Sequence, residues 1–357
     1  MHGPAHSLVA YLVGSGRRTS FLEHPTLTIE PSRWSVYEDG TRCERRAYRL
    51  SFLCRPLAWL IQIVGAVCIG GRRRKFKQVV GVDPLCFLSA WWLRTIGAAD
   101  EAVFYCADYA EQRFGSRMAS AIYRGLDRFA ARHADAVWGV SRRIVELRER
   151  QGIDSARNFL VPNAPLFRED ALVAGEQVRT DLVMIAQLEK GLDLDMLLQG
   201  FGTIGNEHAA ARLHIIGDGS ARDAFEQAIE HAALSDRIVV HGYLEHEEAM
   251  SVVARCGIGL AFYSDDAPWH PYRDSVKIRE YLALGLPVIT SPGHSLAEDV
   301  VAERCGFSVA NAREFADVGC ELIDHSQYAD FRQRAIAYAR RYSKKELLDH
   351  VYAQMRS

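Results

Sequence analysis

The feature that most restricts the fold of this chain is a regular alternation of short apolar runs with longer amphipathic stretches. In the second half, a helical stretch follows each of the strand-like runs DLVMIAQL, ARLHIIGDGS, DRIVVHGYL, IGLAFYS and PVITSP. In the first half, the same alternation involves KQVVGVD, AVFYCAD and DAVWGVS. Strands that are joined by helices run parallel, and parallel sheets are covered by helices on both faces. We therefore predict an α/β protein with two doubly wound parallel sheets.

The length of the chain and its proline pattern predict two domains. At 357 residues the chain exceeds what one hydrophobic core usually serves. The run Pro162-Asn163-Ala164-Pro165 precedes a polar stretch and is the best candidate linker. We expect domains at 1–162 and 163–334, with a C-terminal helix at about 335–357 that packs back on the first domain. Two such domains would face each other across a cleft, where ligands bind at the carboxyl ends of strands.

Charge is unevenly distributed along a chain whose formal net charge is only −2. Residues 1–160 include 24 basic and 15 acidic residues, whereas 161–357 include 19 and 30. The segment 42–77 alone holds ten basic residues and one acidic residue, Glu44. The excess of positive charge is thus local. Because nucleic-acid-binding domains are basic over a whole face, we expect no nucleic-acid partner.

The same segment contains the most apolar stretch of the chain. Leu57 to Gly71 is free of charge over 15 residues and, as a helix, would span roughly 22 Å. That length is less than the ~30 Å hydrocarbon core of a bilayer, so the sequence disfavours a transmembrane helix. Two interpretations remain. The helix either belongs to the core with solvated ends, or lies on an anionic membrane surface with Arg72, Arg73 and Arg74 at one of its basic flanks.

The cysteine and histidine residues predict no metal site. The eight cysteines form no C-x-x-C pair, their spacing fits no zinc module, and the histidines show no ligand spacing. Asp265 and Asp266 lie near two prolines and read as solvated loop acids. Free cysteines within apolar runs favour a reducing, cytoplasmic compartment, and the first 20 residues lack the basic start of a signal peptide.

The strand-to-helix turn at Gly217-Asp218-Gly219 is a candidate ligand-binding loop. Backbone N–H groups and a helix N-terminus at such a turn can face an anion. A dinucleotide fingerprint requires a third glycine where this chain has Arg222, so the motif does not predict NAD binding. The turn is either a plain tight connection or part of a phosphate site.

SVKIREYLALGLPVITS is the most specific stretch of the chain. Helical spacing places its apolar residues on one face, Gly285 ends the helix, and Pro287 leads into a buried strand. Lys277 and Glu280 then share a polar face near the helix start. They form either a solvated ion pair or a nucleotide-sugar site. In the second case Glu280 accepts hydrogens from both ribose hydroxyls, while Lys277 and the positive helix end face the diphosphate.

Four stretches of the second half together resemble the family 4 retaining glycosyltransferases of GT-B architecture. They are, in order, the strand followed by Lys190-Gly191, the IIGDG turn, HGYLEHEEAMSVVARCGIGLAFY and KIREYLALGLPVI. The VPN of 161–163 also matches the interdomain crossing of that family. The resemblance covers about 160–310 well and the first half weakly. It implies a GT-B fold of two Rossmann-like domains facing a cleft.

The resemblance also implies roles for individual residues. In that family, the residue at the position of Glu280 binds the ribose, and the backbone near Tyr243 reads the base. The regions of Lys190, Gly217 and Gly219 face the diphosphate or the transferred sugar.

The chain departs from the family pattern at two positions of the donor site. Tyr272 stands where a second glutamate often contacts the donor sugar. Gln187 and Glu189 occupy the loop in which a basic residue usually precedes the family's lysine. The diphosphate would therefore rely on Lys190 and Lys277.

On the acceptor side, the family begins with a strand and a glycine-rich loop, whereas this sequence begins almost directly with a helix. We therefore expect the first strand to be missing or to lie upstream. Asp108, at the end of a predicted strand, is the candidate catalytic residue for orienting donor or acceptor; the alternative is a helix N-cap.

The predicted activity is transfer of a sugar, with retention, from a nucleoside diphosphate sugar to a lipid-linked or polysaccharide acceptor in cell-envelope or exopolysaccharide synthesis. The protein would act at the inner face of the cell membrane, bound peripherally through 42–77. Such a reaction requires fixed positive charge around the phosphates and no cofactor. One alternative is a nucleotide-sugar epimerase. The other is a non-catalytic binding or scaffold protein, and Tyr272 and the missing first strand favour this second alternative.

Overall fold

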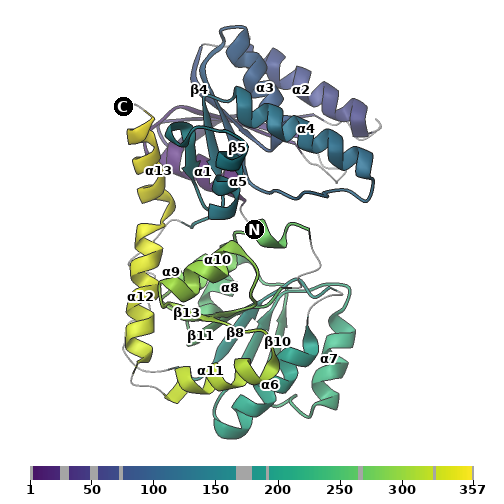
Figure 1. The fold of residues 1–357 in the computed structure, drawn as a ribbon, viewed down its shortest axis with the longest axis vertical. Coiled ribbons are helices and arrows are strands. Elements are labelled where there is room, and N and C mark those ends of the chain that lie inside the picture. Colours follow the sequence, from purple (N-terminus) through teal and green to yellow (C-terminus); the bar gives the residue numbers. More distant parts are fainter. Residues whose placement is uncertain are drawn as a thin grey trace. The chain divides into compact units, whose positions relative to one another are not determined.

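The computed structural model describes residues 3–24, 32–48, 55–71, 75–165, 179–189, 193–263, 268–324 and 327–355. The chain divides into two compact units (Figure 1). We call residues 2–163 with 348–357 the N-unit, and residues 164–347 the C-unit. The assignment of an acceptor side to 1–162 and a donor side to 163–334 stays a prediction.

The N-unit is built around a parallel sheet of four strands in the order β4-β5-β6-β7. The strands are β4 (Phe76–Val82), β5 (Ala99–Cys106), β6 (Ala136–Gly139) and β7 (Asn158–Leu160). Between and after them lie α3 (Pro84–Thr95), α4 (Arg117–His133), α5 (Arg142–Arg150) and the 3-10 helix Ser155–Arg157. Because β4 and β5 are parallel neighbours, their carboxyl ends lie side by side at one edge of the sheet.

A three-stranded antiparallel sheet adds to this parallel architecture. It consists of β1 (Thr19–Glu23), β2 (Ser32–Glu38) and β3 (Thr41–Tyr48), and it lies in the chain between α1 (Pro4–Gly14) and α2 (Arg55–Gly71). Asp39 and Gly40 join β2 to β3 with φ angles of 48° and 78°. Two consecutive left-handed residues are what a tight two-residue hairpin requires, and Asp-Gly is a favoured pair for it.

The end of the chain contributes to the N-unit. α13 (Lys344–Gln354) begins in the C-unit, and its residues from Leu348 onward belong to the N-unit. The Tyr352 hydroxyl donates to Oε1 of Gln78 on β4 at 2.9 Å. The Tyr352 ring also meets the ring of the buried Trp138 nearly at a right angle, with 5.8 Å between the centroids. These contacts fix the last turns of α13 on the parallel sheet of the N-unit.

The C-unit contains a parallel sheet of six strands in the order β10-β9-β8-β11-β12-β13. The strands are β8 (Leu182–Ile185), β9 (Leu213–Ile216), β10 (Ile238–Gly242), β11 (Ile258–Ala261), β12 (Val288–Thr290) and β13 (Gly306–Ser308). Numbered within the unit, this order is 3-2-1-4-5-6, the doubly wound order of Rossmann folds. The winding reverses between β8 and β11, and ligands of such sheets bind beyond the carboxyl ends of the strands at that point.

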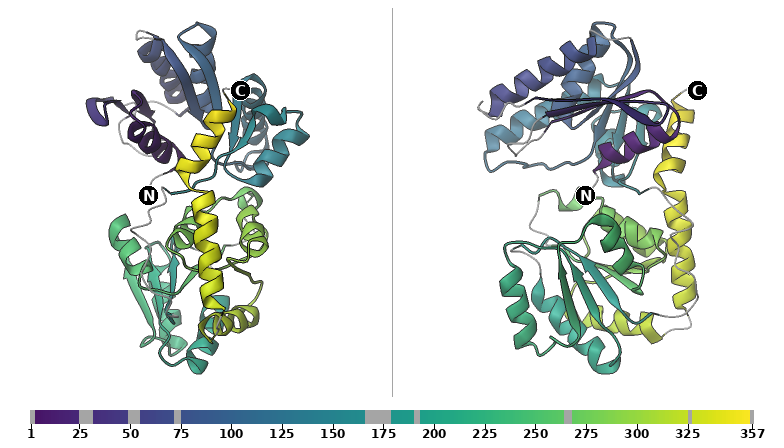
Figure 2. Two further views of the ribbon diagram at one scale, coloured as in Figure 1. Left: turned by 90° about the vertical axis from the view of Figure 1, so that its left-hand side faces the viewer. Right: turned by 180° about the vertical axis from the view of Figure 1, so that it is seen from behind.

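Helices cover both faces of this sheet (Figures 1 and 2). On one face the core contains α6 (Leu194–Glu207), α7 (Arg222–His231) and α11 (Ala312–Asp324). On the other it contains α8 (His246–Val253), α9 (Val276–Ala283), α10 (Ser295–Ala302) and part of α12 (Tyr328–Arg341). Along β8, Leu182 and Met184 belong to the first core, and Val183 belongs to the second. Burial on both faces explains why the strands read as continuous apolar runs.

Among the described residues, no helix combines the length and the hydropathy needed to cross a bilayer. The apolar stretch 57–71 lies in α2, which has 17 residues and packs against α3. Val67 of α2 is buried in a small core with Leu93 and Ala99. Large apolar side chains of α2 that remain exposed are Leu60, Ile61 and Val64. One face of α2 thus packs on α3, and apolar side chains elsewhere on the helix remain exposed.

Close packing fixes α9 against the C-unit sheet. A Cβ atom on Gly259 of β11 would lie 2.4 Å from Cδ2 of Tyr281, so only glycine leaves room for that fully buried ring. The Tyr281 hydroxyl accepts the backbone N–H of Ile185 at 2.7 Å. One side chain of α9 is therefore bound to both β11 and β8.

We predict that Gly259→Ala destabilises the protein by about 1–3 kcal/mol, because the added methyl group overpacks the Tyr281 ring. The matched control is Gly202→Ala within α6, where the nearest atom to a new Cβ, Cδ1 of Leu234, is 4.0 Å away. That change should stabilise the protein by about 0.5–1 kcal/mol, since alanine favours a helix interior over glycine. Urea unfolding of both variants measures the difference; equal stability of the two would contradict the packing argument.

Candidate functional site

The start of α9 lies at the carboxyl edge of the C-unit sheet, where β8 and β11 are neighbours. Tyr263, two residues beyond the end of β11, lies with its hydroxyl 2.6 Å from Oγ of Ser275. Ser275 is the N-cap of α9, and its Oγ accepts the backbone N–H of Ile278. The positive dipole end of α9 is thus at the position where Rossmann-type sheets bind ligands.

A buried ion pair holds this helix start in place. Nη2 and Nε of Arg279 donate to Oδ1 of Asp274 at 2.6 and 2.9 Å, and both side chains are no more than 5% exposed. Nη1 of Arg279 lies 3.5 Å from the hydroxyl of Tyr338 on α12, and this hydroxyl donates to Asp299 at 2.8 Å. Arg279 therefore binds α9 to its neighbours, and it does not share the face of the helix that carries Lys277 and Glu280.

Lys277 lies near a second cation that the sequence does not predict. Burial lowers the pKa of Lys277, the nearby Arg273 guanidinium lowers it further, and Glu280 opposes both effects. Arg273 lies over the Tyr263 ring, with Cζ 4.1 Å from the centroid. Two cations that are held close together repel each other, and an anion bound beside them would relieve that repulsion. The pair is suited to a phosphate group.

Glu280 is a carboxyl group with little access to solvent. Its side chain is 14% exposed, and burial raises its pKa to about 7, although the positive charge of Lys277 acts in the opposite direction. Nε2 of His246, at the start of α8, lies 3.8 Å from Oε1 of Glu280. These surroundings contradict the solvated ion pair that the sequence left open. They suit a carboxylate that accepts hydrogen bonds from the hydroxyl groups of a ligand.

Gly217 and Gly219 have packing roles in the turn after β9. A Cβ atom on either would lie 1.8–2.2 Å from a backbone oxygen of the segment 186–188, and Gly217 has a φ of 135°. The N–H of Gly217 donates to the carbonyl of Gly242, and the N–H of Gly219 donates to the Asp218 carboxylate, both at 2.8 Å. Because these two amides already have acceptors within the protein, the expected diphosphate contact of this turn stays a prediction.

Tyr243 and Lys190 are the remaining donor-site candidates. Tyr243 follows β10 at the carboxyl edge of the sheet, its side chain is exposed, and its hydroxyl donates to Oε1 of Glu245 at 3.3 Å. Lys190 lies outside the described residues. The roles that the family resemblance implies for both residues stay predictions.

Asp108 lies beyond the carboxyl end of β5 in the N-unit, and its side chain is half exposed. Nη1 of Arg113 donates to its Oδ2 at 2.9 Å, and Nη2 lies 3.8 Å from the carboxylate of Asp83, which follows β4. Asp83 also accepts the hydroxyl hydrogen of Tyr123 at 2.8 Å. Since the N-cap of α4 is Ser116, Asp108 does not cap that helix. Its catalytic role stays a prediction, and Asp83 and Arg113 are neighbours that the sequence did not identify.

Family models match both units of the chain. A model described as "Glycosyl transferases group 1" matches residues 179–325, and one described as "Glycosyl transferase 4-like domain" matches residues 5–164. The two matches together span most of the sequence. The chain belongs to the GT-B glycosyltransferases.

Solved structures confirm the GT-B fold of this glycosyltransferase. Sucrose-phosphate synthase from Thermosynechococcus elongatus is 16% identical with a TM-score of 0.68, over 98% of this chain and 92% of that one. HepE from Anabaena in complex with UDP-glucose is 14% identical with a TM-score of 0.62, over 84% of each chain. A mutant of S. aureus TarM in complex with fondaparinux, alpha-GlcNAc-glycerol and UDP is 13% identical with a TM-score of 0.61, over 95% of this chain and 76% of that one. No curated protein matches the sequence significantly.

We predict that Glu280→Gln stabilises the glycosyltransferase above pH 7. Burial raises the pKa of the Glu280 carboxyl from 4.5, its value in the unfolded chain, to about 7. The contribution of this group to the stability of the fold is therefore fully present below pH 4.5 and is lost as the pH rises through 7. At pH 8 the ionised group is buried, and the neutral amide should recover about 2–4 kcal/mol in urea unfolding. The gain should vanish at pH 4.

The matched control is Glu230→Gln, because Glu230 is exposed on α7. That change should alter stability by less than about 0.5 kcal/mol at either pH. A Glu280→Gln variant that is no more stable than the wild type at pH 8 would show that the carboxylate is not desolvated.

Proposed function

We propose that this glycosyltransferase moves a sugar, with retention, from a nucleoside diphosphate sugar to a lipid-linked or polysaccharide acceptor in cell-envelope or exopolysaccharide synthesis. The observation that carries the proposal is the start of α9, where two cations and a desolvated carboxyl group adjoin a helix N-terminus at the sheet switch. Cations suit a diphosphate and the carboxylate suits the ribose hydroxyls.

The proposed chemistry follows from the charge that develops on the leaving group. As the bond between the anomeric carbon and the diphosphate breaks, negative charge grows on the phosphate oxygens beside an oxocarbenium-like sugar. Lys277, Arg273 and the N-terminus of α9 would stabilise that charge without rearranging. A leaving-group oxygen can take the proton of the acceptor hydroxyl on the same face of the sugar, which gives retention. The reaction as proposed needs neither a paired carboxylate nor a cofactor.

The solved structures suggest which donor to test first. HepE was solved with UDP and with UDP-glucose, and a pneumococcal O-GlcNAc transferase, GtfA, was solved with UDP and GlcNAc. We propose a UDP-sugar as the first donor, with GDP-, ADP- and TDP-sugars as its competitors. Tyr272, where the family often has a second glutamate, lies in the 3-10 helix His270–Tyr272 just before α9. That difference favours the alternative of a non-catalytic binding protein, which should bind a nucleotide sugar without turning it over.

We predict that the preferred donor, at 100 times its Kd, stabilises the protein by about 2.7 kcal/mol. Glu280→Ala and Lys277→Ala should remove this shift and the transfer activity, whereas the exposed Glu230→Ala should keep both. Thermal shift measures binding, and NMR of the product measures the anomeric configuration. Retained kcat/KM in both α9 variants would overturn the proposal. Conversion of the donor in the absence of any acceptor would instead identify an epimerase.

The acceptor part of the proposal rests on the surface of the N-unit. The face of α2 that does not pack on α3 exposes Leu60, Ile61 and Val64. α4, which also packs on α3, exposes Met118 and Ile122. Exposed apolar helices with a basic flank are the composition of an interfacial membrane surface. We propose that these helices and 42–77 bind the anionic inner face of the cell membrane, and that the protein acts from the cytoplasm on an acceptor presented there.

We predict salt-sensitive flotation of the protein with liposomes that contain anionic lipid. Replacing Arg72, Arg73 and Arg74 by serine should weaken binding by about 3 kcal/mol, roughly a hundredfold, because each basic residue near the surface adds about 1 kcal/mol. The matched control replaces three exposed arginines elsewhere in the N-unit: Arg128, Arg132 and Arg150. Equal loss in both triple variants would indicate a mere charge effect, and no flotation of the wild type would remove the membrane claim.

A further inference from the structure

Two helices of the C-unit approach each other unusually closely, on the face of the sheet away from α9. A Cβ atom on Gly200 of α6 would lie 2.3 Å from Cδ1 of Phe315, and one on Gly319 of α11 would lie 2.5 Å from Cδ1 of Ile204. Each helix therefore has a glycine where the other inserts a large side chain. This contact brings the C-terminal ends of α6 and α11 together.

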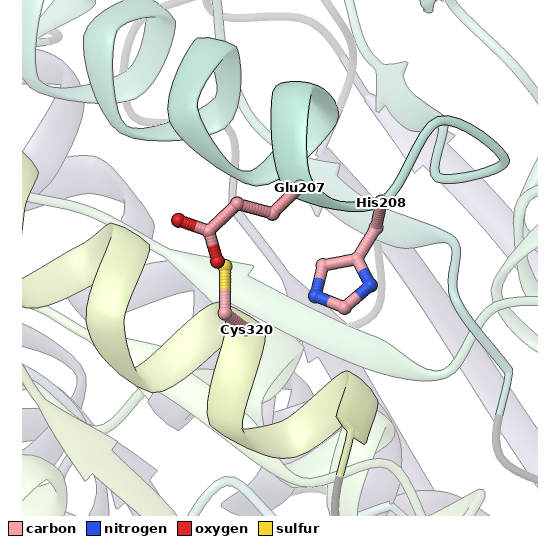
Figure 3. A group of neighbouring side chains, drawn as sticks. All are labelled: Glu207, His208 and Cys320. Carbon is pink, nitrogen blue, oxygen red and sulfur yellow. The ribbon is translucent and has the colours of Figure 1, made fainter.

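A mixed group of potential metal ligands lies where these ends meet. Glu207 and His208 end α6, and Cys320 lies in the last turns of α11 (Figure 3). One ligand atom of each lies within 4.8 Å of the other two. Asp324, the last residue of α11 and one helical turn beyond Cys320, has Oδ2 3.6 Å from Nε2 of the histidine. A thiol, an imidazole and two carboxylates thus come from two helix ends.

The histidine is the observation that points to a ligand. Nε2 of His208 is buried and makes no hydrogen bond among the described residues, and the Asp324 carboxylate approaches it only to 3.6 Å. The backbone holds the residue in place, because its N–H donates to Ile204 at 2.8 Å and its carbonyl accepts the N–H of Ala211 at 2.9 Å. A buried imidazole nitrogen without a hydrogen bond costs free energy, and a cation bound between it and the carboxylates would compensate that cost.

The surrounding charge favours a cation at the same place. Both helices present their C-terminal ends, which carry the negative pole of the helix dipole. Cys320 is buried, and the Glu207 carboxylate lies beside it. A metal ion bound beside Cys320 would hold the thiol as its thiolate, because metal ligands bind in their deprotonated form.

We propose that Glu207, His208, Cys320 and Asp324 form a structural zinc site that joins the end of α6 to the end of α11. A thiolate, an imidazole and two carboxylates are the donors that tetrahedral Zn²⁺ accepts, whereas Mg²⁺ and Ca²⁺ prefer oxygen alone. Binding forms a bond from the sulfur to the metal and releases the thiol proton to the solvent. Because four protein ligands complete the coordination, no position remains for catalytic water.

The position of the site separates it from donor binding. In a parallel sheet, a helix that follows a strand runs back toward the amino end of that strand. The C-terminal ends of α6 and α11 therefore lie at the edge opposite to the carboxyl edge where α9 begins. Zinc should accordingly change the stability of the C-unit and leave donor affinity unchanged. The spacing of the cysteines does not reveal the site, because Cys320 is its only cysteine.

The test uses the full chain, stripped with a chelator and then titrated with Zn²⁺ or Co²⁺. We expect one metal per chain, a rise in Tm with Zn²⁺, and a thiolate-to-cobalt absorption band with Co²⁺. Cys320→Ala and His208→Gln should each weaken Zn²⁺ binding by more than about 100-fold, since even the loss of an outer-shell partner costs 10–100-fold. Circular dichroism of the metal-free variants establishes that they fold.

Cys43→Ser is the matched control, because Cys43 is an exposed cysteine of β3 and the kind of thiol that binds zinc adventitiously. It should keep the stoichiometry and the Tm shift of the wild type. Absence of stoichiometric zinc in the wild type would overturn the proposal. So would unchanged zinc affinity in both ligand variants, or loss of the site in Cys43→Ser.

Discussion

The contact between the Tyr281 ring and the bare backbone of Gly259 is the constraint on which the candidate site depends. Glycine lets the ring lie directly on β11, and the tyrosine hydroxyl then accepts the N–H of Ile185 on β8. One side chain therefore fixes α9 to both strands that flank the topological switch. Once the helix is held there, Lys277 and Glu280 must stand at the carboxyl edge of the sheet. The chemistry of the proposed donor site thus depends on a buried residue that is not among its proposed ligand-binding groups.

The sequence was sufficient to predict the parts of the fold and site that obey local rules. Alternation of apolar runs and amphipathic helices predicts two parallel sheets, and a period of 3.6 residues predicts that Lys277 and Glu280 share a helix face. Arg273 and His246 follow no such rule. The first precedes the helix in an irregular segment, and the second belongs to α8, so only tertiary packing brings them to the site. The spacing of residues along the sequence cannot predict neighbours that only tertiary packing brings together.

Other features are visible in the sequence but ambiguous until packing is known. Gly217 and Gly219 suit a phosphate loop and a tight turn equally well, and the backbone oxygens beside them show that packing alone already requires glycine. Similarly, hydropathy sets the length of α2 but not which of its faces packs on α3. The burial of Glu280 cannot be predicted from the sequence either. The free-energy cost of ionising a buried carboxyl group depends on neighbouring atoms that are far away in the chain.

The contact between α6 and α11 has a consequence for how the C-unit folds. Gly200 meets Phe315 and Gly319 meets Ile204 across about 115 residues of chain, from the helix that follows the first strand of the six-stranded sheet to the helix that follows its last strand. Contacts of such high contact order close a large loop, so the chain must lose much entropy before they form. During synthesis the core on that face stays open until α11 has left the ribosome. We expect cooperative, comparatively slow folding, and truncation before α11 should expose apolar surface that aggregates.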